Sequence, residues 1–254
     1  MSAQPPAEQG LIFGEVADQY DAARPSYPDE LFDAVIEYGD LHAGDPALEI
    51  GAGTGKGTMG FIARGLDVHA LEPSAEMARV LRGKGVTVET TSFESWPGRA
   101  GSFRLVFAAQ AWHWVRASDR YEHVANALVP GGALALFWNR ARGWTGPLGD
   151  ANDAAYEEHA PHLTSSVREW ELDRTVDEIA RCARLSEATR RVTTWEQTYT
   201  TAEYVALLGT HSDHRILPAD KRAQFHAAVA AVIDAHGARV DVTYDVMLYL
   251  ATRS

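Results

Sequence analysis

Cysteine and lysine are both scarce in this sequence of 254 residues. Cys182 is the only cysteine, which excludes a disulfide within the chain. The residues around it have a helical pattern rather than that of a nucleophile's pocket, so we do not expect a catalytic thiol. Lysine occurs only at Lys56, Lys84 and Lys221, and arginine supplies nearly all of the positive charge.

Basic residues are fewer than acidic residues, and the formal net charge is −12. Proteins that bind nucleic acid normally need a clustered basic surface, so this balance argues against such a partner. No apolar run approaches the roughly 18 residues that span a bilayer, and no basic segment leads into an apolar one near the N-terminus. We therefore expect a cytoplasmic protein with neither a membrane nor a nucleic acid as partner. Its length suits one α/β domain, or one domain with a small lid.

Glycines cluster after a short apolar segment. Residues 47–50 suit a buried strand, and Gly51, Gly53 and Gly55 follow at alternate positions. Glycine tolerates positive φ and has no Cβ, so this spacing allows a sharp turn and a close approach to a ligand. Glu49, near the strand end, would repel a pyrophosphate but accept a hydrogen bond from an amine or a hydroxyl. The segment therefore predicts a loop for a cationic or neutral ligand.

Strand and helix patterns alternate up to Asn139 and change rhythm after it. The expected strands are 47–50, 68–71, 86–90, 103–108 and 133–138, the last preceded by a turn at 130–132. The expected helices are 13–21, 28–39, 57–64, 75–82 and 118–128. This alternation predicts βαβ units with right-handed crossovers and a mostly parallel sheet. Beyond Asn139 we expect helices at 149–159, 175–183, 201–208 and 218–236, and strands at 189–199 and 240–250.

An acid ends the second predicted strand. Glu72 lies 21 residues beyond Gly51, where an acid can accept hydrogen bonds from both ribose hydroxyls. The glycine loop and this acid together predict a ligand that contains a nucleoside, either a dinucleotide or S-adenosylmethionine; the alternative is a tight turn and a solvated acid. Residues 55–60 match the dinucleotide pattern G-x-G-x-x-G, but they begin where the helix should start. The better frame is Glu49-x-Gly51-x-Gly53-x-Gly55.

In that frame the sequence resembles the class I S-adenosylmethionine-dependent methyltransferases over nearly the whole chain. Residues 49–55 resemble their first motif, 92–94 their adenine-side loop, 110–114 the end of their fourth strand, and 130–132 the turn before their fifth. The entry segment 20–28 and the Ala-Gln-Ala-Trp-His-Trp stretch resemble the small-molecule branch related to trans-aconitate and cantharidin methyltransferases. The resemblance implies a Rossmann-like three-layer sandwich with a seven-stranded, mostly parallel sheet and a helical lid insert.

The resemblance also implies a division of the chain and a set of donor contacts. The ranges are 1–38 for an N-terminal tail and helical cover, 39–139 for the donor-binding core, 140–185 for the lid insert and 186–254 for the completion of the sheet with acceptor-side helices. The implied S-adenosylmethionine contacts are Tyr20, Arg24, Glu49, Gly51, Gly53, Gly55, Glu72, Pro73, Ser92, Phe93, Glu94 and Gln110. Two positions depart from the family pattern: many relatives carry an acid in place of Ser92, and Arg104 replaces a common strand-four aspartate, which we interpret as a surface change.

Methyl transfer needs little protein chemistry, because the sulfonium carries its own leaving group and the enzyme mainly aligns the reactants and excludes water. A base is needed only for a neutral hydroxyl, thiol or ammonium acceptor, and His113 is the first candidate. His211 and His214 are second. The alternative for His113 is a packed or hydrogen-bonded histidine that shapes the pocket. The predicted acceptor residues are Trp112, Trp114, Trp138, Asn139, Arg140, Trp144, Tyr156 and His211, some of which would be plain core.

The predicted function is transfer of a methyl group from S-adenosylmethionine to a carboxylate, hydroxyl, amine or carbon of a small organic acceptor, as in secondary metabolism. No metal is expected, and the sequence leaves the oligomeric state open. Two other classes remain: a nicotinamide-dependent oxidoreductase that uses the displaced glycine pattern, and a non-catalytic protein that binds S-adenosylmethionine.

Overall fold

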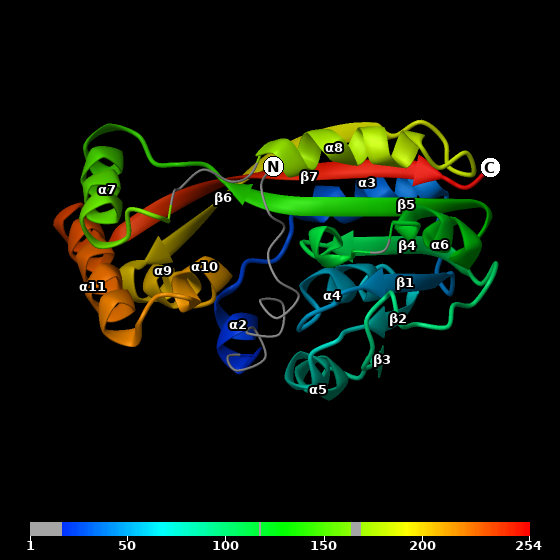
Figure 1. Ribbon diagram of the computed structural model, residues 1–254, viewed down its shortest axis with the longest axis horizontal. Coiled ribbons are helices and arrows are strands. Elements are labelled where there is room, and N and C mark those ends of the chain that lie inside the picture. The colour runs from blue at the N-terminus through cyan, green and yellow to red at the C-terminus, as the bar shows by residue number, and fades with distance from the viewer. Residues whose placement is uncertain (1–16, 117, 164–168) are drawn as a thin grey trace. The chain divides into compact units, whose positions relative to one another are not determined.

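The computed structural model describes residues 17–116, 118–163 and 169–254, which form an α/β fold with one seven-stranded sheet (Figure 1). The strands lie in the order β3-β2-β1-β4-β5-β7-β6. Their bounds are β1 Pro46–Ile50, β2 Asp67–Leu71, β3 Thr87–Glu89, β4 Phe103–Ala109, β5 Leu128–Ala141, β6 Thr189–Thr200 and β7 Arg239–Thr252. β1 pairs in parallel with β2 and β4, β2 with β3, and β4 with β5. The predicted seven-stranded, mostly parallel sheet is confirmed.

β7 runs antiparallel to both of its neighbours. Its pairing with β5 places Arg253 against Gly131 and Gly132 at one end and Thr243 against Arg142 at the other, as the backbone hydrogen bonds show. Residue numbers therefore rise along β5 as they fall along β7, which defines an antiparallel ladder.

Helices connect the strands and follow most of the predicted ranges. Their bounds are α2 Ala17–Ala23, α3 Asp29–Gly39, α4 Lys56–Ile62, α5 Ala75–Gly83, α6 Arg120–Ala127, α7 Gly146–His159, α8 Glu169–Ala180, α9 Thr201–Leu208, α10 Ser212–Arg215 and α11 Ala219–Ala235, with a short 3₁₀ helix, η2, at Trp112–Trp114. The Thr200/Glu203 capping box and the Ser74 N-cap are both present. The predicted helix at 13–21 falls partly outside the described residues. None of the described helices has the length and apolarity needed to cross a bilayer.

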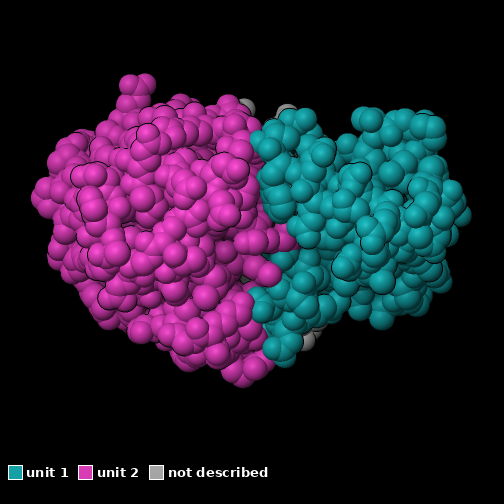
Figure 2. Space-filling view, turned by 180° about the vertical axis from the view of Figure 1, so that it is seen from behind, with its two compact units in different colours: residues 1–24, 140–167, 194–245 teal, residues 25–139, 168–193, 246–254 magenta. Residues whose placement is uncertain are grey.

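The described residues group into two compact units (Figure 2). The larger contains 25–139 without residue 117, together with 169–193 and 246–254; the smaller contains 17–24, 140–163 and 194–245. The division falls inside β5, β6 and β7. Of the predicted lid at 140–185, α7 belongs to the smaller unit and α8 to the larger, so this range is not one structural piece. A lid role for α7 stays a prediction.

In the larger unit, alternate strand residues face two different helix layers. On β4, Val106 joins a buried cluster with Val124 of α6 and Ile179 of α8. The next residue, Phe107, points the other way and packs on Phe61 of α4, with ring centroids 4.5 Å apart. This alternation with period two confirms the predicted three-layer sandwich.

β5 is longer than the sequence predicts. The turn expected at 130–132 lies inside the strand, which begins at Leu128, and the prediction of a strand starting at Ala133 is wrong. The segment keeps a turn-like feature, since Gly131 has φ +75° and the register with β4 shifts between Phe103 and Leu105. Pairing with Arg253, the residue after β7, draws these residues into the sheet, and a contact that distant in sequence leaves no local signal.

Arg104 has a structural role that the sequence does not indicate. Its Nη2 atom donates to the carbonyls of Gly39 and Asp40 at the C-terminal end of α3, and each donor–acceptor distance is 3.0 Å. These carbonyls lack helical partners, and a cation there also favours the helix dipole. Arg104 therefore caps α3 and is more than the surface change that we expected.

Candidate functional site

The loop between β1 and α4 adopts the conformation that its glycines predict. Gly51, Gly53 and Gly55 have φ of +68°, +56° and +95°. The backbone N–H of Gly51 donates to the carbonyl of Leu71, over 2.9 Å, which ties the loop to the end of β2. A Cβ on Gly51 would lie 2.6 Å from the Cβ of Ala111, so this position also admits the segment after β4. The loop thus stands where three strand ends meet.

The glycines of the competing dinucleotide pattern have a different use. Gly57 and Gly60 lie inside α4, after the loop. A Cβ on Gly60 would be 2.1 Å from the ring of Phe32, and one on Gly57 would be 2.7 Å from Oε1 of Glu49. Both glycines are explained by close packing of α4, so the frame that begins at Glu49 describes the loop.

Glu72 is bonded to the glycine loop. It is 6% exposed, and its carboxylate accepts from the backbone N–H of Gly53 over 2.7 Å and from that of Ser74 over 2.8 Å. Burial raises the pKa of Glu72, and the two backbone hydrogen bonds oppose that rise. A carboxylate can accept about four hydrogen bonds, so two acceptor positions remain for a ligand.

Glu49 is fully buried under the same loop. Its Oε2 accepts from the hydroxyl of Thr58, whereas Oε1 has no hydrogen-bond partner among the described residues. Burial raises the pKa of Glu49 to about 8, and the nearby charge of Glu72 adds to the rise. An unpartnered acceptor this deep is costly unless a donor completes it. Two buried acids beside one glycine loop, neither ion-paired within the described structure, suit a ligand with positive charge and hydroxyl groups.

Gln110 marks the end of β4. It has φ +57°, which is uncommon for a residue other than glycine and often accompanies function. Its Nε2 donates to the carbonyl of Asn139 over 2.9 Å, and Nδ2 of Asn139 donates to the carbonyl of Ser26 over 2.8 Å. The ends of β4 and β5 and the entry segment are joined in this way.

His113 lies in η2, the first turn after β4. The indole Nε1 of Trp138 donates to its Nδ1 over 3.4 Å, and its ring lies 4.9 Å from that of Trp114. Because Nδ1 accepts, the neutral imidazole carries its proton on Nε2. His113 therefore presents an N–H donor rather than a free base, which favours the alternative of a hydrogen-bonded histidine.

Comparison with known proteins relates this core to methyltransferases. The family model described as a methyltransferase domain matches residues 47–132, from β1 to the start of β5. This stretch of the chain is therefore similar to methyltransferase domains. An uncharacterised methyltransferase of Mycobacterium tuberculosis is 40% identical over 149 residues, which cover 56% of this chain and 59% of that protein. The chain thus spans about three-fifths of the length of the curated relatives it matches first.

Solved structures resemble this chain in fold. A protein of Anaeromyxobacter dehalogenans assigned as a type II methyltransferase matches with a TM-score of 0.66 and 22% identity, covering 89% of this chain and 97% of that one. A phosphoethanolamine N-methyltransferase of Haemonchus contortus, bound to S-adenosylhomocysteine, matches with a TM-score of 0.56 and 14% identity, over 94% of this chain and 57% of that one. At these identities the likeness shows the fold, and it confirms the predicted class I methyltransferase fold.

Several of the predicted donor contacts are engaged within the protein. The ring of Phe93 is 3% exposed and packs 6.2 Å from the rings of Trp96 and Trp112, so only its backbone remains for an adenine contact. Glu94 accepts from the backbone N–H of Arg116 over 2.7 Å. Ser92 hydrogen-bonds to Ser95, and Pro73 is exposed beside Glu72.

Trp112 and Trp138 are largely buried. Trp112 is 1% exposed, and its indole N–H donates to the hydroxyl of Tyr121 over 2.9 Å. This burial favours the alternative of plain core for Trp112, and contact with an acceptor stays a prediction. Trp138 is 8% exposed, with its ring edge-on to Tyr249, and it reaches the candidate site through His113.

The remaining predicted residues belong to the smaller unit. Arg24 lies 5.2 Å from the ring centroid of Tyr20 and donates to the carbonyl of Thr210 over 3.1 Å, while its buried Nε has no partner among the described residues. Burial, and then the charge of Arg24, hold the pKa of His211 well below its usual range. The structure thus brings Tyr20, Arg24 and His211 together.

His211, Asp213 and His214 offer ligand atoms within 4.8 Å of one another, as a metal site would require. Burial lowers the pKa of both histidines, however, and the charge of Arg24 lowers it further. The same charge would oppose a bound cation. This cluster does not replace the prediction of a metal-free site.

Other members of the predicted acceptor set pack into the core of the smaller unit. The ring centroids of Trp144 and Tyr204 lie 4.9 Å apart, and those of Tyr156 and Phe225 lie 4.7 Å apart. Arg140 has a buried Nε that no described residue hydrogen-bonds. These side chains shape the smaller unit, and direct contact with an acceptor stays a prediction for each.

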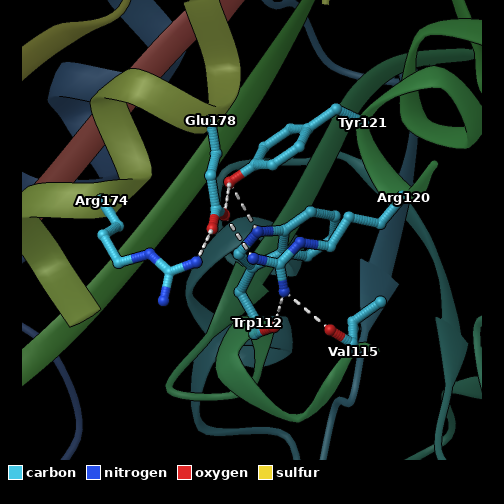
Figure 3. A network of polar contacts seen from close by, with 6 residues as sticks. All are labelled: Trp112, Val115, Arg120, Tyr121, Arg174 and Glu178. Carbon is cyan, nitrogen blue, oxygen red and sulfur yellow. Dashed lines mark hydrogen bonds and ion pairs between the residues drawn. The ribbon is translucent and has the colours of Figure 1, made fainter. Parts of the chain in front are cut away.

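Sequence reasoning missed one group of residues altogether. Arg120 and Tyr121 of α6 meet Glu178 of α8 beside η2, across a separation of more than fifty residues (Figure 3). No motif marks them, since Arg120 and Glu178 read as ordinary helix surface positions. Only the packing of α6 and α8 on one face of the sheet brings them together.

Proposed function

We propose that the chain is an S-adenosylmethionine-dependent methyltransferase that methylates a small organic acceptor. The observation that carries this proposal is the pair of buried carboxyl groups, Glu49 and Glu72, on one glycine loop with no ion-pair partner among the described residues. A donor with an ammonium group, a sulfonium and a ribose diol matches these two acids. A dinucleotide would bring a pyrophosphate against the loop above Glu49, and repulsion by the ionised form of Glu49 disfavours the nicotinamide alternative.

The residues of the loop fit the donor at separate points. Oε1 of Glu49 would accept from the ammonium group, and the two acceptor positions left on Glu72 would take the ribose hydroxyls. Gly51 and Gly53 leave room for the methionine portion. The family resemblance implies that Tyr20 and Arg24 would lie at the donor carboxylate. It also implies that Gln110 would lie beside the sulfonium.

The bound donor supplies an activated methyl group, and the chain's own residues align the acceptor and exclude water. His113 carries its proton on Nε2, so it would donate a hydrogen bond to an acceptor oxygen or nitrogen and orient a lone pair toward the methyl group. Acceptors that are already nucleophilic, such as a carboxylate or a phenolate, suit this arrangement better than a neutral alcohol. The branch related to trans-aconitate and cantharidin methyltransferases, and a role in secondary metabolism, agree with such an acceptor.

A transfer assay tests the proposal. The protein and S-adenosylmethionine labelled in its methyl group are incubated with a fraction of small metabolites, and label is sought in small products. We expect label to appear in one or a few small acids or phenols, and Glu72→Ala to reduce it at least tenfold. Tight binding of the donor with no labelled product from any fraction would favour a non-catalytic binding protein instead.

A further inference from the structure

The segment that carries His113 is a short turn. η2 spans three residues, and among the described residues two backbone hydrogen bonds close it, from Trp114 N–H to the Ala111 carbonyl and from Val115 N–H to the Trp112 carbonyl. A 3₁₀ turn this short has weak internal geometry and depends on its surroundings. The orientation of the imidazole must therefore be fixed from outside the turn.

Arg120 of α6 supplies an external tie on each side of His113. Its Nη1 donates to the carbonyl of Trp112 over 3.2 Å and to that of Val115 over 2.6 Å (Figure 3). The guanidinium also lies 5.0 Å from the centroid of the Trp112 ring. One planar group thus holds the residue before His113 and the residue at the end of the turn.

Glu178 of α8 holds Arg120 in turn. Its Oε2 accepts from Nη2 of Arg120 and, over 3.5 Å, from the hydroxyl of Tyr121, which itself accepts from the indole of Trp112. Oε1 of Glu178 lies 3.5 Å from Nη2 of Arg174. The side chains of Arg120 and Glu178 are 14% and 20% exposed, so solvent screens this pair less than a surface pair.

We propose that Arg120 and Glu178 are positioning residues, which fix the imidazole of His113 for the acceptor without touching donor or acceptor. Glu178 holds Nη2 of the Arg120 guanidinium. Because this group is planar and rigid, Nη1 is then held against the carbonyls of Trp112 and Val115. The inference rests on the proposed function. It adds that α8 governs the acceptor side of the site and leaves the donor loop at Glu49 and Glu72 unchanged.

Three variants of the full chain test this proposal: Glu178→Gln and Arg120→Lys, with Arg174→Gln as the matched control. Arg174→Gln removes a contact to the same glutamate but leaves the tie to η2 intact. The readouts are hydrogen exchange of the Trp114 and Val115 amides, and the ¹⁵N shifts of His113, which report its tautomer and are assigned with His113→Gln. We expect both test variants to speed exchange at these amides at least tenfold and to mix the two tautomers. The control should stay within about threefold of the wild type.

Donor binding separates this inference from the function itself. S-adenosylhomocysteine should bind all three variants within about threefold of the wild type; if it binds none of them, nor the wild type, the proposed function fails. Unchanged exchange and an unchanged His113 tautomer in Glu178→Gln and Arg120→Lys would overturn the positioning role. So would exchange that rises equally across β4, β5 and η2, because that outcome indicates a general loss of stability.

Discussion

The carboxylate of Glu72 accepts a hydrogen bond from the backbone N–H of Gly53 over 2.7 Å, so the acid and the glycine loop form one unit. The acid at the end of β2 holds the loop in its ligand-ready shape and keeps two acceptor positions for the ligand. Glu49 lies beneath the same loop, fully buried. Donor binding and loop conformation are therefore expected to change together when either acid is altered.

Replacing Glu72 with alanine should weaken donor binding and lower stability. The change removes the proposed ribose contact. It also leaves the N–H groups of Gly53 and Ser74 without their acceptor, which should lower the free energy of unfolding by about 1–3 kcal/mol. We expect S-adenosylhomocysteine to bind at least tenfold more weakly by calorimetry. Glu76→Gln, at an exposed acid of α5, is the control and should bind normally. Normal affinity in folded Glu72→Ala would remove Glu72 from the ribose.

Stability of the ligand-free protein should depend on the ionisation of Glu49. Its pKa is about 8 when folded, against an ordinary value of 4.5, so the folded state holds a proton that the unfolded state releases between these values. The contribution is fully present below pH 4.5 and is lost as pH rises through about 8. Urea unfolding from pH 6 to 9 should show a fall that Glu49→Gln lacks. Equal slopes in the two proteins would contradict the buried, protonated carboxyl.

Donor affinity should follow the opposite trend with pH. A charged Glu49 accepts a hydrogen bond from an ammonium group more strongly than a protonated Glu49 does. S-adenosylhomocysteine should therefore bind more tightly as pH rises toward about 8. Below that pH, Glu49 should release a proton when the ligand binds. Calorimetry in buffers of different ionisation enthalpy measures that proton. Glu49→Gln should release none, and release by this variant equal to the wild type would assign the proton to another group.

The family resemblance predicts that Arg24 binds the donor carboxylate. Its guanidinium has no acidic partner among the described residues, and its Nε is buried. Arg24→Gln should weaken S-adenosylhomocysteine about tenfold but leave 5′-methylthioadenosine, which lacks the amino-acid portion, unchanged. Arg239→Gln, at an exposed arginine of the same unit, is the control. Equal losses for both ligands would exclude a carboxylate contact.

The glycine at position 60 should be required for packing rather than for a cofactor. Gly60→Ala would place a Cβ 2.1 Å from the ring of Phe32, and we expect a loss of about 2 kcal/mol or more of unfolding free energy. Gly83→Ala is the matched control in α5, where a Cβ meets nothing within 4 Å and where alanine should be neutral or stabilising by up to about 1 kcal/mol. Thermal unfolding of the two variants gives the comparison, and equal stability would contradict the packing role.

The sequence predicted those parts of the site that local pattern determines. The strand, the loop glycines and Glu72 follow from a run of about twenty residues whose turn and strand signals are local, and the structure places Glu72 on Gly53. The early start of β5 was missed, because it depends on pairing with Arg253, more than a hundred residues away.

Burial was harder to predict than position. Trp112 and Trp114 are neighbours in one aromatic stretch, yet the fold buries Trp112 against Tyr121 and Arg120 while Trp114 stays half-buried. The sequence shows the aromatic character of the stretch but not which ring faces α6. The Arg120–Glu178 pair has the same origin, since two helices must pack before it exists.

The most direct test of the account is a calorimetric titration of the wild-type protein at pH 8 with S-adenosylhomocysteine and, separately, with NADH. The two buried acids on the glycine loop predict one site for S-adenosylhomocysteine, with a Kd of about 1–100 μM, and no measurable heat from NADH. Binding of NADH without binding of S-adenosylhomocysteine would contradict the central claim.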